Sequence, residues 1–240
     1  MIKKLLNQWI TKRKGHDYRI DERIPAGYLF GLVTRRIFML VRGFFSGIKN
    51  DGTFFLSAKA VIRARSKMKL GHSVTIERAV YIDALSSGGI VLGNNVSVGR
   101  NTKIEGSGNL QYLGKGLIAG NNVGLGKDCF YGCAGGISIG DDTIIGNYTS
   151  FHSENHLTND PDVLIRLQGV EHKGIIIGKN CWIGAKSTIL DGAVIQDGCV
   201  IAAGAVVKAG CYPANGIYGG VPAKLIRYRA DIPVLSKHFS

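Results

Sequence analysis

Residues 177–212 divide into six consecutive hexapeptides, which read IGKNCW, IGAKST, ILDGAV, IQDGCV, IAAGAV and VKAGCY. Each hexapeptide opens on Ile or Val, and each carries Cys, Ser or Ala at its fifth position. One aliphatic and one small residue at fixed places in a short period are typical of a β-solenoid. Short strands point the aliphatic side chains into a narrow core, and only small side chains fit inside the corners. This stretch therefore predicts an all-β solenoid.

The same register continues upstream of this stretch. Twelve further lead residues follow it: Leu70, Ile76, Ile82, Leu92, Val98, Ile104, Ala119, Leu125, Tyr131, Ile139, Ile145 and Phe151. Three hexapeptides make one triangular coil of 18 residues, so the pattern predicts six coils at 70–87, 92–109, 119–136, 139–156, 177–194 and 195–212. Glycine often follows the lead residue, as at Gly93 and Gly184. We expect these glycines to supply positive φ at the corners.

The repeat divides the chain into three parts. We expect a basic, partly helical N-terminal extension at 1–69, a β-helix at 70–212 and a short C-terminal extension at 213–240. A 20-residue loop at 157–176 interrupts the β-helix. Loops of this length in compact domains are usually functional or disordered.

The positive charge is concentrated in the N-terminal extension. Residues 1–69 contain 16 Lys and Arg against 4 Asp and Glu, out of a net charge of +13 for the chain. Within 27–48, the spacing of Phe30, Val33, Ile37, Val41 and Phe44 predicts a helix with one apolar stripe. We interpret this helix as a cap on the open end of the solenoid. The alternative is an interfacial helix on anionic lipid, and nucleic acid is the least favoured partner.

Cysteine usage and hydropathy bear on the location of the protein. Cys129, Cys181, Cys199 and Cys211 occupy the small corner position, which favours packed thiols in a reducing compartment over disulfides or a metal cluster. No uncharged apolar run reaches the 18 or more residues of a transmembrane helix. We expect a cytoplasmic protein, peripheral at the inner face of the membrane if the N-terminal helix binds lipid.

The candidate catalytic residues lie just before the long loop. Residues 150–156 read SFHSENH, which places two histidines, His152 and His156, at the rim of the solenoid. A neutral imidazole can take a proton from a hydroxyl near pH 7. With His172 as a third ligand, the same residues suggest a zinc site as an alternative.

Four segments together resemble a known family. SFHSENH at 150–156, CWIGA at 181–185, IAAGAVV at 201–207 and GVPAK at 220–224 are similar to motifs of the hexapeptide-repeat acyltransferases. The resemblance is strongest to bacterial sugar O-acetyltransferases of surface-polysaccharide synthesis and of the maltose/galactoside type. It implies a left-handed parallel β-helix, a homotrimer and an acyl-CoA groove between neighbouring subunits.

The resemblance also implies roles for individual residues. His156 matches the family's catalytic base, with His152, Glu154 and Asn155 as residues that contact the substrate or support the base. The residues that match the CoA groove are Trp182, Gly184, Ala185, Ala202, Ala203, Gly204, Lys208, Lys224 and Arg227. Lys208 stands one position away from the lysine of the family pattern.

The predicted function is transfer of an acetyl group from acetyl-CoA, as co-substrate, to a hydroxyl of a sugar or of a glycan, including a lipid-linked one. We expect no metal and no nucleic-acid partner. The alternatives are an N-acyltransferase acting on an amino sugar or amino acid, a zinc hydratase of the γ-carbonic-anhydrase kind using His152, His156 and His172, and a non-catalytic solenoid.

Overall fold

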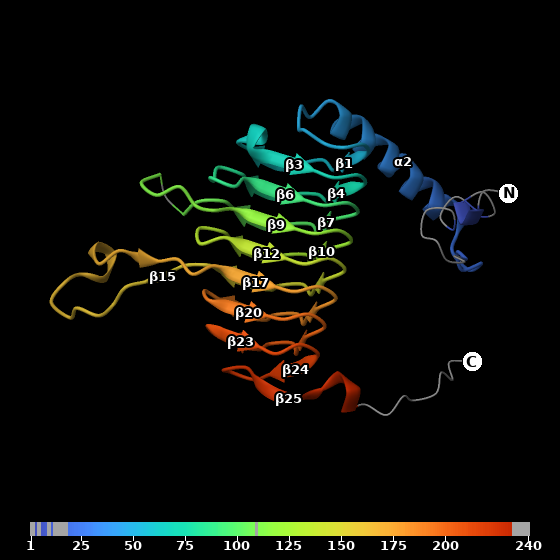
Figure 1. Ribbon diagram of the computed structural model, residues 1–240. Helices are drawn as coiled ribbons and strands as arrows, with labels where there is room; N and C mark the ends of the chain where they lie inside the picture. Colours follow the sequence, from blue (N-terminus) through green and yellow to red (C-terminus); the bar gives the residue numbers. More distant parts are fainter. Residues whose placement is uncertain (1–2, 4–5, 9–10, 12–18, 109, 232–240) are drawn as a thin grey trace.

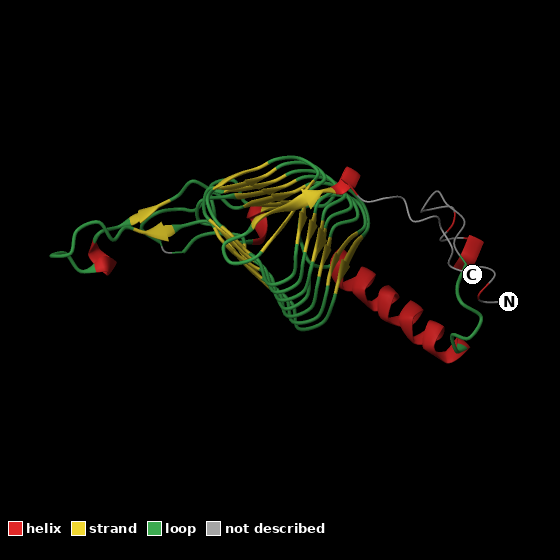
Figure 2. Cartoon of the chain, turned by 90° about the horizontal axis from the view of Figure 1, so that it is seen from below, coloured by secondary structure: helices red, strands yellow, loops and turns green. Residues whose placement is uncertain are grey.

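Three parallel β-sheets wind around a single hydrophobic core in the computed structural model, which describes residues 3, 6–8, 11, 19–108 and 110–231 (Figure 1). Seen along its axis, the solenoid has a triangular cross-section (Figure 2). The predicted parallel β-helix is thereby confirmed. The early parts of the extension at 1–18 and the tail at 232–240 fall largely outside the described residues.

Each sheet forms one side of the triangle, and we call them sheets I, II and III in the order in which the chain meets them. Sheet I contains β1 (Phe54–Leu56), β4 (Val74–Ile76), β7 (Ser97–Val98), β10 (Gly124–Leu125), β13 (Ile144–Ile145), β18 (Trp182–Ile183), β21 (Val200–Ile201), β24 (Gly216–Gly219) and β25 (Lys224–Tyr228). Sheet II contains β2 (Val61–Arg63), β5 (Tyr81–Asp83), β8 (Lys103–Glu105), β11 (Phe130–Gly132), β14 (Ser150–His152), β19 (Thr188–Leu190) and β22 (Val206–Val207). Sheet III contains β3 (Met68–Leu70), β6 (Ile90–Leu92), β9 (Leu117–Ala119), β12 (Ile137–Ile139), β17 (Ile175–Ile177), β20 (Ala193–Ile195) and β23 (Gly210–Tyr212).

The predicted limits of the β-helix were too narrow. The first coil begins at β1 and not at residue 70, because β1 and β2 pair in parallel with β4 and β5. The 3₁₀ turn η1 (Arg65–Lys67) lengthens the chain between Ile62 and Leu70 and so hides the six-residue count. The described residues form seven three-strand coils instead of the predicted six, and β24 continues sheet I beyond residue 212. β25 then turns back antiparallel to β24.

The inward positions of the hexapeptides are confirmed. All eighteen predicted lead residues from Leu70 to Val207 are at most 4% exposed. Cys129, Cys181 and Cys199 are buried free thiols, but Cys211 is exposed, so its predicted place in the core was wrong. Tyr212 pairs with Ile195 and takes the inward position in that coil. A shift of one residue turns every side chain of a strand to the opposite face.

The predicted role of the corner glycines was also wrong. Gly93 and Gly184 do not have positive φ; that conformation lies two residues further on, at Asn95 and Lys186. A Cβ atom on Gly184 would collide with the backbone at Ala203 in the next coil. Glycine is therefore needed at these positions because neighbouring coils stack closely there. It is not needed for a positive φ angle.

The N-terminal helix is confirmed as α2 (Ala26–Phe44). Its buried residues are Leu29, Met39 and Gly43, and a Cβ on Gly43 would collide with the Phe54 carbonyl of β1. The capping interpretation predicts that the stripe of Phe30, Ile37, Val41 and Phe44 faces the solenoid, but all four side chains are exposed. Among the described helices, none is long and apolar enough to cross a bilayer.

Candidate active site

The long loop is a projecting arm, residues 154–173, that leaves the corner between sheets II and III (Figures 1 and 2). Its root is a short hairpin in which β15 (Asn155–His156) pairs antiparallel with β16 (Val170–Glu171). The 3₁₀ turn η2 (Ile165–Leu167) lies near its outer end. The sequence predicts the insertion, whereas the hairpin is seen only in the structure.

A cavity of about 270 Å³ lies at the root of the arm. Its lining residues come from three neighbouring coils and the arm: Glu105, Gly108, Phe130, Gly132, Cys133, Ala134, His152, Ser153, Glu154 and His156. Gly132 stands in register between Glu105 and His152 on the outer face of sheet II. Because Gly132 has no side chain, the face is hollow at this point.

Three of the four predicted catalytic and supporting residues, His152, Glu154 and His156, line this cavity, and Asn155 does not. His156 is exposed on β15, and the His152 ring lies 5.6 Å from the Phe130 ring, centroid to centroid. Oε2 of Glu154 lies 3.1 Å from Nε2 of His172, across the root of the arm. Asn155 is exposed and stands opposite Glu171 in the hairpin.

Ser153 fixes the backbone beneath these side chains. Its buried hydroxyl donates to the carbonyl of Gly132 at 2.7 Å and accepts from the amide of Gly135 at 2.9 Å. These two bonds tie the start of the arm to the preceding coil. His156, three residues later, is thus held close to a rigid part of the solenoid.

The three histidines of the zinc alternative do not form a ligand set. Within the residues that the structure describes, no group of three His, Cys, Asp or Glu side chains is arranged to hold a metal ion. His172 instead contacts Glu154.

The cavity contains one thiol, that of Cys133. Burial, with a further contribution from the charge of Glu105, raises the pKa of Cys133 well above its ordinary value. The thiolate is the nucleophilic form of cysteine, so Cys133 stays protonated and unreactive at neutral pH. Glu105, Phe130, Gly132 and Cys133 were missed by the sequence analysis, because only the stacking of coils brings them beside His156.

The residues predicted to bind CoA gather mainly at a different corner, between sheets I and II. Trp182 is 57% exposed on sheet I, and Gly184 and Ala185 follow it at the corner. The next coil stacks there through Ala202–Gly204, with the amide of Gly204 donating to the carbonyl of Ala185 at 2.9 Å. The turn before β25 packs below, where the amide of Ala223 donates to the carbonyl of Val206 at 2.8 Å.

Three basic residues complete the predicted CoA set. Lys224 and Arg227 are exposed on β25, which borders this corner. Lys208 is exposed after β22, at the corner between sheets II and III, and so lies apart from the other eight residues.

His156 and the predicted CoA residues are separated within one chain. The full width of sheet II lies between the two corners, as at β14 (Ser150–His152). At about 3.3 Å per residue, a three-residue strand spans roughly 10 Å. Apart from Lys208, the residues that match the CoA motifs therefore lie across the width of sheet II from His156 in one chain.

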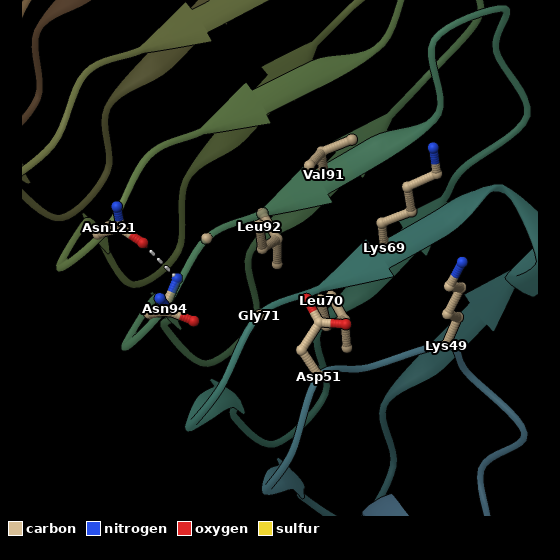
Figure 3. Close-up of a pocket in the computed structure, with 10 residues that line it drawn as sticks. Lys49, Asp51, Lys69, Leu70, Gly71, Val91, Leu92, Asn94 and Asn121 are labelled. Carbon is tan, nitrogen blue, oxygen red and sulfur yellow. Dashed lines mark hydrogen bonds between the residues drawn. The ribbon is translucent and has the colours of Figure 1, made fainter.

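A second hollow, of about 390 Å³, lies between the first coils and is lined by Lys49, Asp51, Lys69, Leu70, Gly71, Val91, Leu92, Gly93, Asn94 and Asn121 (Figure 3). Its polar groups are largely structural. The side chain of Asn94 accepts from the amide of His72 at 2.7 Å, and that of Asn121 accepts from the amide of Asn94 at 2.9 Å. This ladder joins neighbouring coils, and no histidine lines the hollow.

Residues 174–209 match the family model for the bacterial transferase hexapeptide (six repeats). No curated protein matches the chain. Among solved structures, the N-acyltransferase AntD from Bacillus cereus, in complex with dTDP and 3-hydroxybutyryl-CoA, is 21% identical, with a TM-score of 0.52 and coverage of 77% of this chain and 85% of that one. A maltose O-acetyltransferase from Clostridium difficile 630 is 22% identical, with a TM-score of 0.43 and coverage of 73% and 70%. The chain thus carries the bacterial transferase hexapeptide repeat and has the left-handed parallel β-helix fold.

Proposed function

We propose that the protein is an acyl-CoA-dependent acyltransferase that transfers an acetyl group from acetyl-CoA to a hydroxyl of a sugar or glycan. The observation that carries the proposal is His156 beside a small cavity, lined also by His152, Glu105 and Glu154, on a hexapeptide-repeat solenoid. AntD, which shares the fold, has been solved with an acyl-CoA. The protonated state of Cys133 favours direct transfer over a covalent thioester intermediate.

In this mechanism, His156 removes the proton from the acceptor hydroxyl as the oxygen attacks the thioester carbonyl. The tetrahedral intermediate collapses, the carbon–sulfur bond breaks, and the imidazolium returns its proton to the departing thiolate of CoA. The products are the acetyl ester and free CoA. General base catalysis of this kind typically contributes a factor of about 10²–10⁴ in rate. Binding both substrates side by side supplies a further part of the acceleration.

We propose that the working form is a homotrimer in which each site is shared. The corner that matches the CoA motifs and the corner that carries His156 lie on opposite edges of sheet II. In a cyclic trimer, one edge of each prism faces the other edge of its neighbour, so three equivalent grooves result. Each groove would receive Trp182 and the Ala202–Gly204 corner from one subunit and His156 from the next.

The cavity favours a hydroxyl acceptor over an amine. Glu105 and Glu154 both line it. Nearby carboxylates stabilise the protonated form of an amine, which is not nucleophilic, whereas they accept hydrogen bonds from sugar hydroxyls. The volume of about 270 Å³ lies just below the roughly 300–1,000 Å³ usual for drug-sized ligands. It suits one sugar unit.

The proposal is tested by measuring CoA release from acetyl-CoA with a panel of neutral, acidic and amino sugars. His156→Ala should lower turnover by at least about a hundredfold, with the affinity for acetyl-CoA within a few fold of the wild type. His72→Ala, at an exposed histidine in an early coil, is the matched control and should retain activity. Near-normal turnover of His156→Ala, together with a large loss in His152→Ala, would transfer the role of base to His152. Release of CoA only with amino acceptors would favour N-acylation.

A further inference from the structure

Helix α2 contacts the solenoid through only one of its faces. Met39 and Gly43 are buried, and Gly43 packs directly on the backbone of β1. The guanidinium of Arg36 lies 4.1 Å from the centre of the Phe55 ring, and its Nη1 donates to Oγ1 of Thr75 at 3.0 Å. Figures 1 and 2 show the rest of the helix standing away from the prism. The orientation of α2 is therefore fixed at its C-terminal end.

The opposite face of α2 is apolar and exposed. Its large side chains are between 48% and 81% exposed, and they are Phe30, Ile37, Phe38, Val41, Phe44 and the adjoining Phe45. The spacings of seven and of three or four residues place them on one side of the helix. Soluble proteins seldom expose a contiguous apolar surface of this kind unless it binds a partner or a membrane. We call these six residues the aromatic face.

The charged residues of α2 itself are all basic. Residues 24–50 contain no Asp or Glu. Arg35 and Arg42 are exposed and lie seven residues apart, so they form a pair along one border of the aromatic face. Lys49 is exposed just beyond the helix. Their long side chains can reach past the apolar surface to anionic groups beside it.

We propose that α2 is an interfacial helix that binds anionic lipid bilayers, with the aromatic face inserted among the lipid chains and Arg35 and Arg42 on the headgroups. An apolar face bordered by basic residues is the pattern of helices that lie in the membrane surface. A second copy of the chain fits less well. Packing two such helices together would bring two basic segments into contact, and like charges repel. The anionic headgroups attract the same charges.

The test uses the full-length protein and sedimentation with phosphatidylcholine vesicles, with and without about one-third phosphatidylglycerol. We expect binding to the anionic vesicles at about 0.1 M salt and release at about 0.5 M, since salt screens the attraction. Phe38→Ser with Phe44→Ser should weaken binding at least about tenfold, because it removes much of the inserted surface. Arg35→Gln with Arg42→Gln should remove most of the preference for anionic lipid. Leu110→Ser, at an 88% exposed apolar residue on another loop, is the control and should bind as the wild type does.

A tryptophan reporter distinguishes insertion from simple charge attraction. In Phe38→Trp, emission should shift to the blue with anionic vesicles and should be quenched by brominated lipid chains. Binding without a blue shift or quenching would overturn the insertion of the aromatic face. Failure of the wild type to bind any vesicle at low salt would overturn the proposal altogether. A smaller oligomer for Phe38→Ser with Phe44→Ser in light scattering, with vesicle binding unchanged, would assign the aromatic face to a second copy. These readouts do not depend on acyl transfer.

Discussion

Nε2 of His172 lies 3.1 Å from Oε2 of Glu154, and this contact joins the two ends of the arm directly beside the candidate active site. Glu154 lies two residues before His156 in the sequence, immediately before β15. Both side chains are partly screened from solvent, with 27% of His172 and 36% of Glu154 exposed. The contact therefore fastens the two ends of the arm to each other. We expect it to restrict the position of His156 as well.

Breaking this contact should affect the acceptor more than acetyl-CoA. We expect Glu154→Gln and His172→Phe each to raise KM for the acceptor several-fold, while the affinity for acetyl-CoA stays within a factor of two, because the CoA motifs lie at another corner. Amide hydrogen exchange in 155–171 should become faster. Glu171→Gln removes the more exposed contact to Lys173 at 3.0 Å and is the matched control, since exposed ion pairs contribute little. Unchanged exchange and unchanged KM in Glu154→Gln would show that the contact does not order the arm.

Tyr131 offers a stabilising substitution inside the core. Its ring stacks on Phe151 with centroids 4.7 Å apart. Among the described residues its buried hydroxyl makes no hydrogen bond of ordinary geometry, and the thiol of Cys129, a weak hydrogen-bonding group, is its neighbour. Burial raises the pKa of this hydroxyl well above its ordinary value. An unsatisfied buried polar group costs about 1–3 kcal/mol. Tyr131→Phe keeps the ring and should raise the midpoint of thermal unfolding by about 2–4 °C per kcal/mol gained. A lower midpoint would mean that the hydroxyl makes a stabilising interaction.

The five thiols should separate into one reactive and four protected groups. Cys211 is exposed, whereas Cys129, Cys133, Cys181 and Cys199 are buried. We expect one thiol per chain to react quickly with a thiol reagent at pH 8 and all five to react after unfolding. Fast labelling of two or more thiols in the native protein would contradict the burial of this set. Cys211→Ser should abolish the fast reaction and leave the slow one unchanged.

The buried thiols also predict a loss of stability at alkaline pH. Burial raises the pKa of Cys181 from 9.0 to about 11. Between these values the unfolded chain has lost the thiol proton and the folded chain keeps it, so the free energy of unfolding falls as pH rises through this window. Below pH 9 the contribution of the thiol is fully present. Urea unfolding at pH 8 and pH 10 measures the change, and Cys181→Ser should reduce it.

The sequence predicts the inside of the solenoid better than its outside. The hexapeptide count identifies the inward residues between Leu70 and Val207, because the narrow core accepts only large apolar side chains there, as at Ile183 and Ile201. It fails where the number of residues between strands changes, at η1 and before Tyr212, because a period cannot reveal an inserted or missing residue. The cavity beside His156 depends on stacking across coils, which aligns Gly132 with Glu105 on one side and with His152 on the other. The number of residues between these aligned positions differs from coil to coil, so the sequence count does not reveal the alignment. The side of α2 that packs on β1 is fixed by Gly43, and hydropathy alone does not distinguish that side from the aromatic face.

The separation of His156 from the CoA corner leads to a test of the shared site. Two variants are prepared, one with His156→Ala and one with Ala203→Asp, which would place a negative charge where the phosphates or pantetheine of CoA are expected to approach. Each alone should be nearly inactive.

If neighbouring subunits share each site, mixing denatured chains and refolding them together should restore activity, because some grooves pair an intact His156 with an intact Ala202–Gly204 corner. For random trimers from equal amounts, about a quarter of the grooves are of this kind. Activity near a quarter of the wild type would support the shared arrangement. Mixtures no more active than the separate variants, although light scattering shows that mixed trimers form, would place both sets of residues in the same chain's site and overturn it.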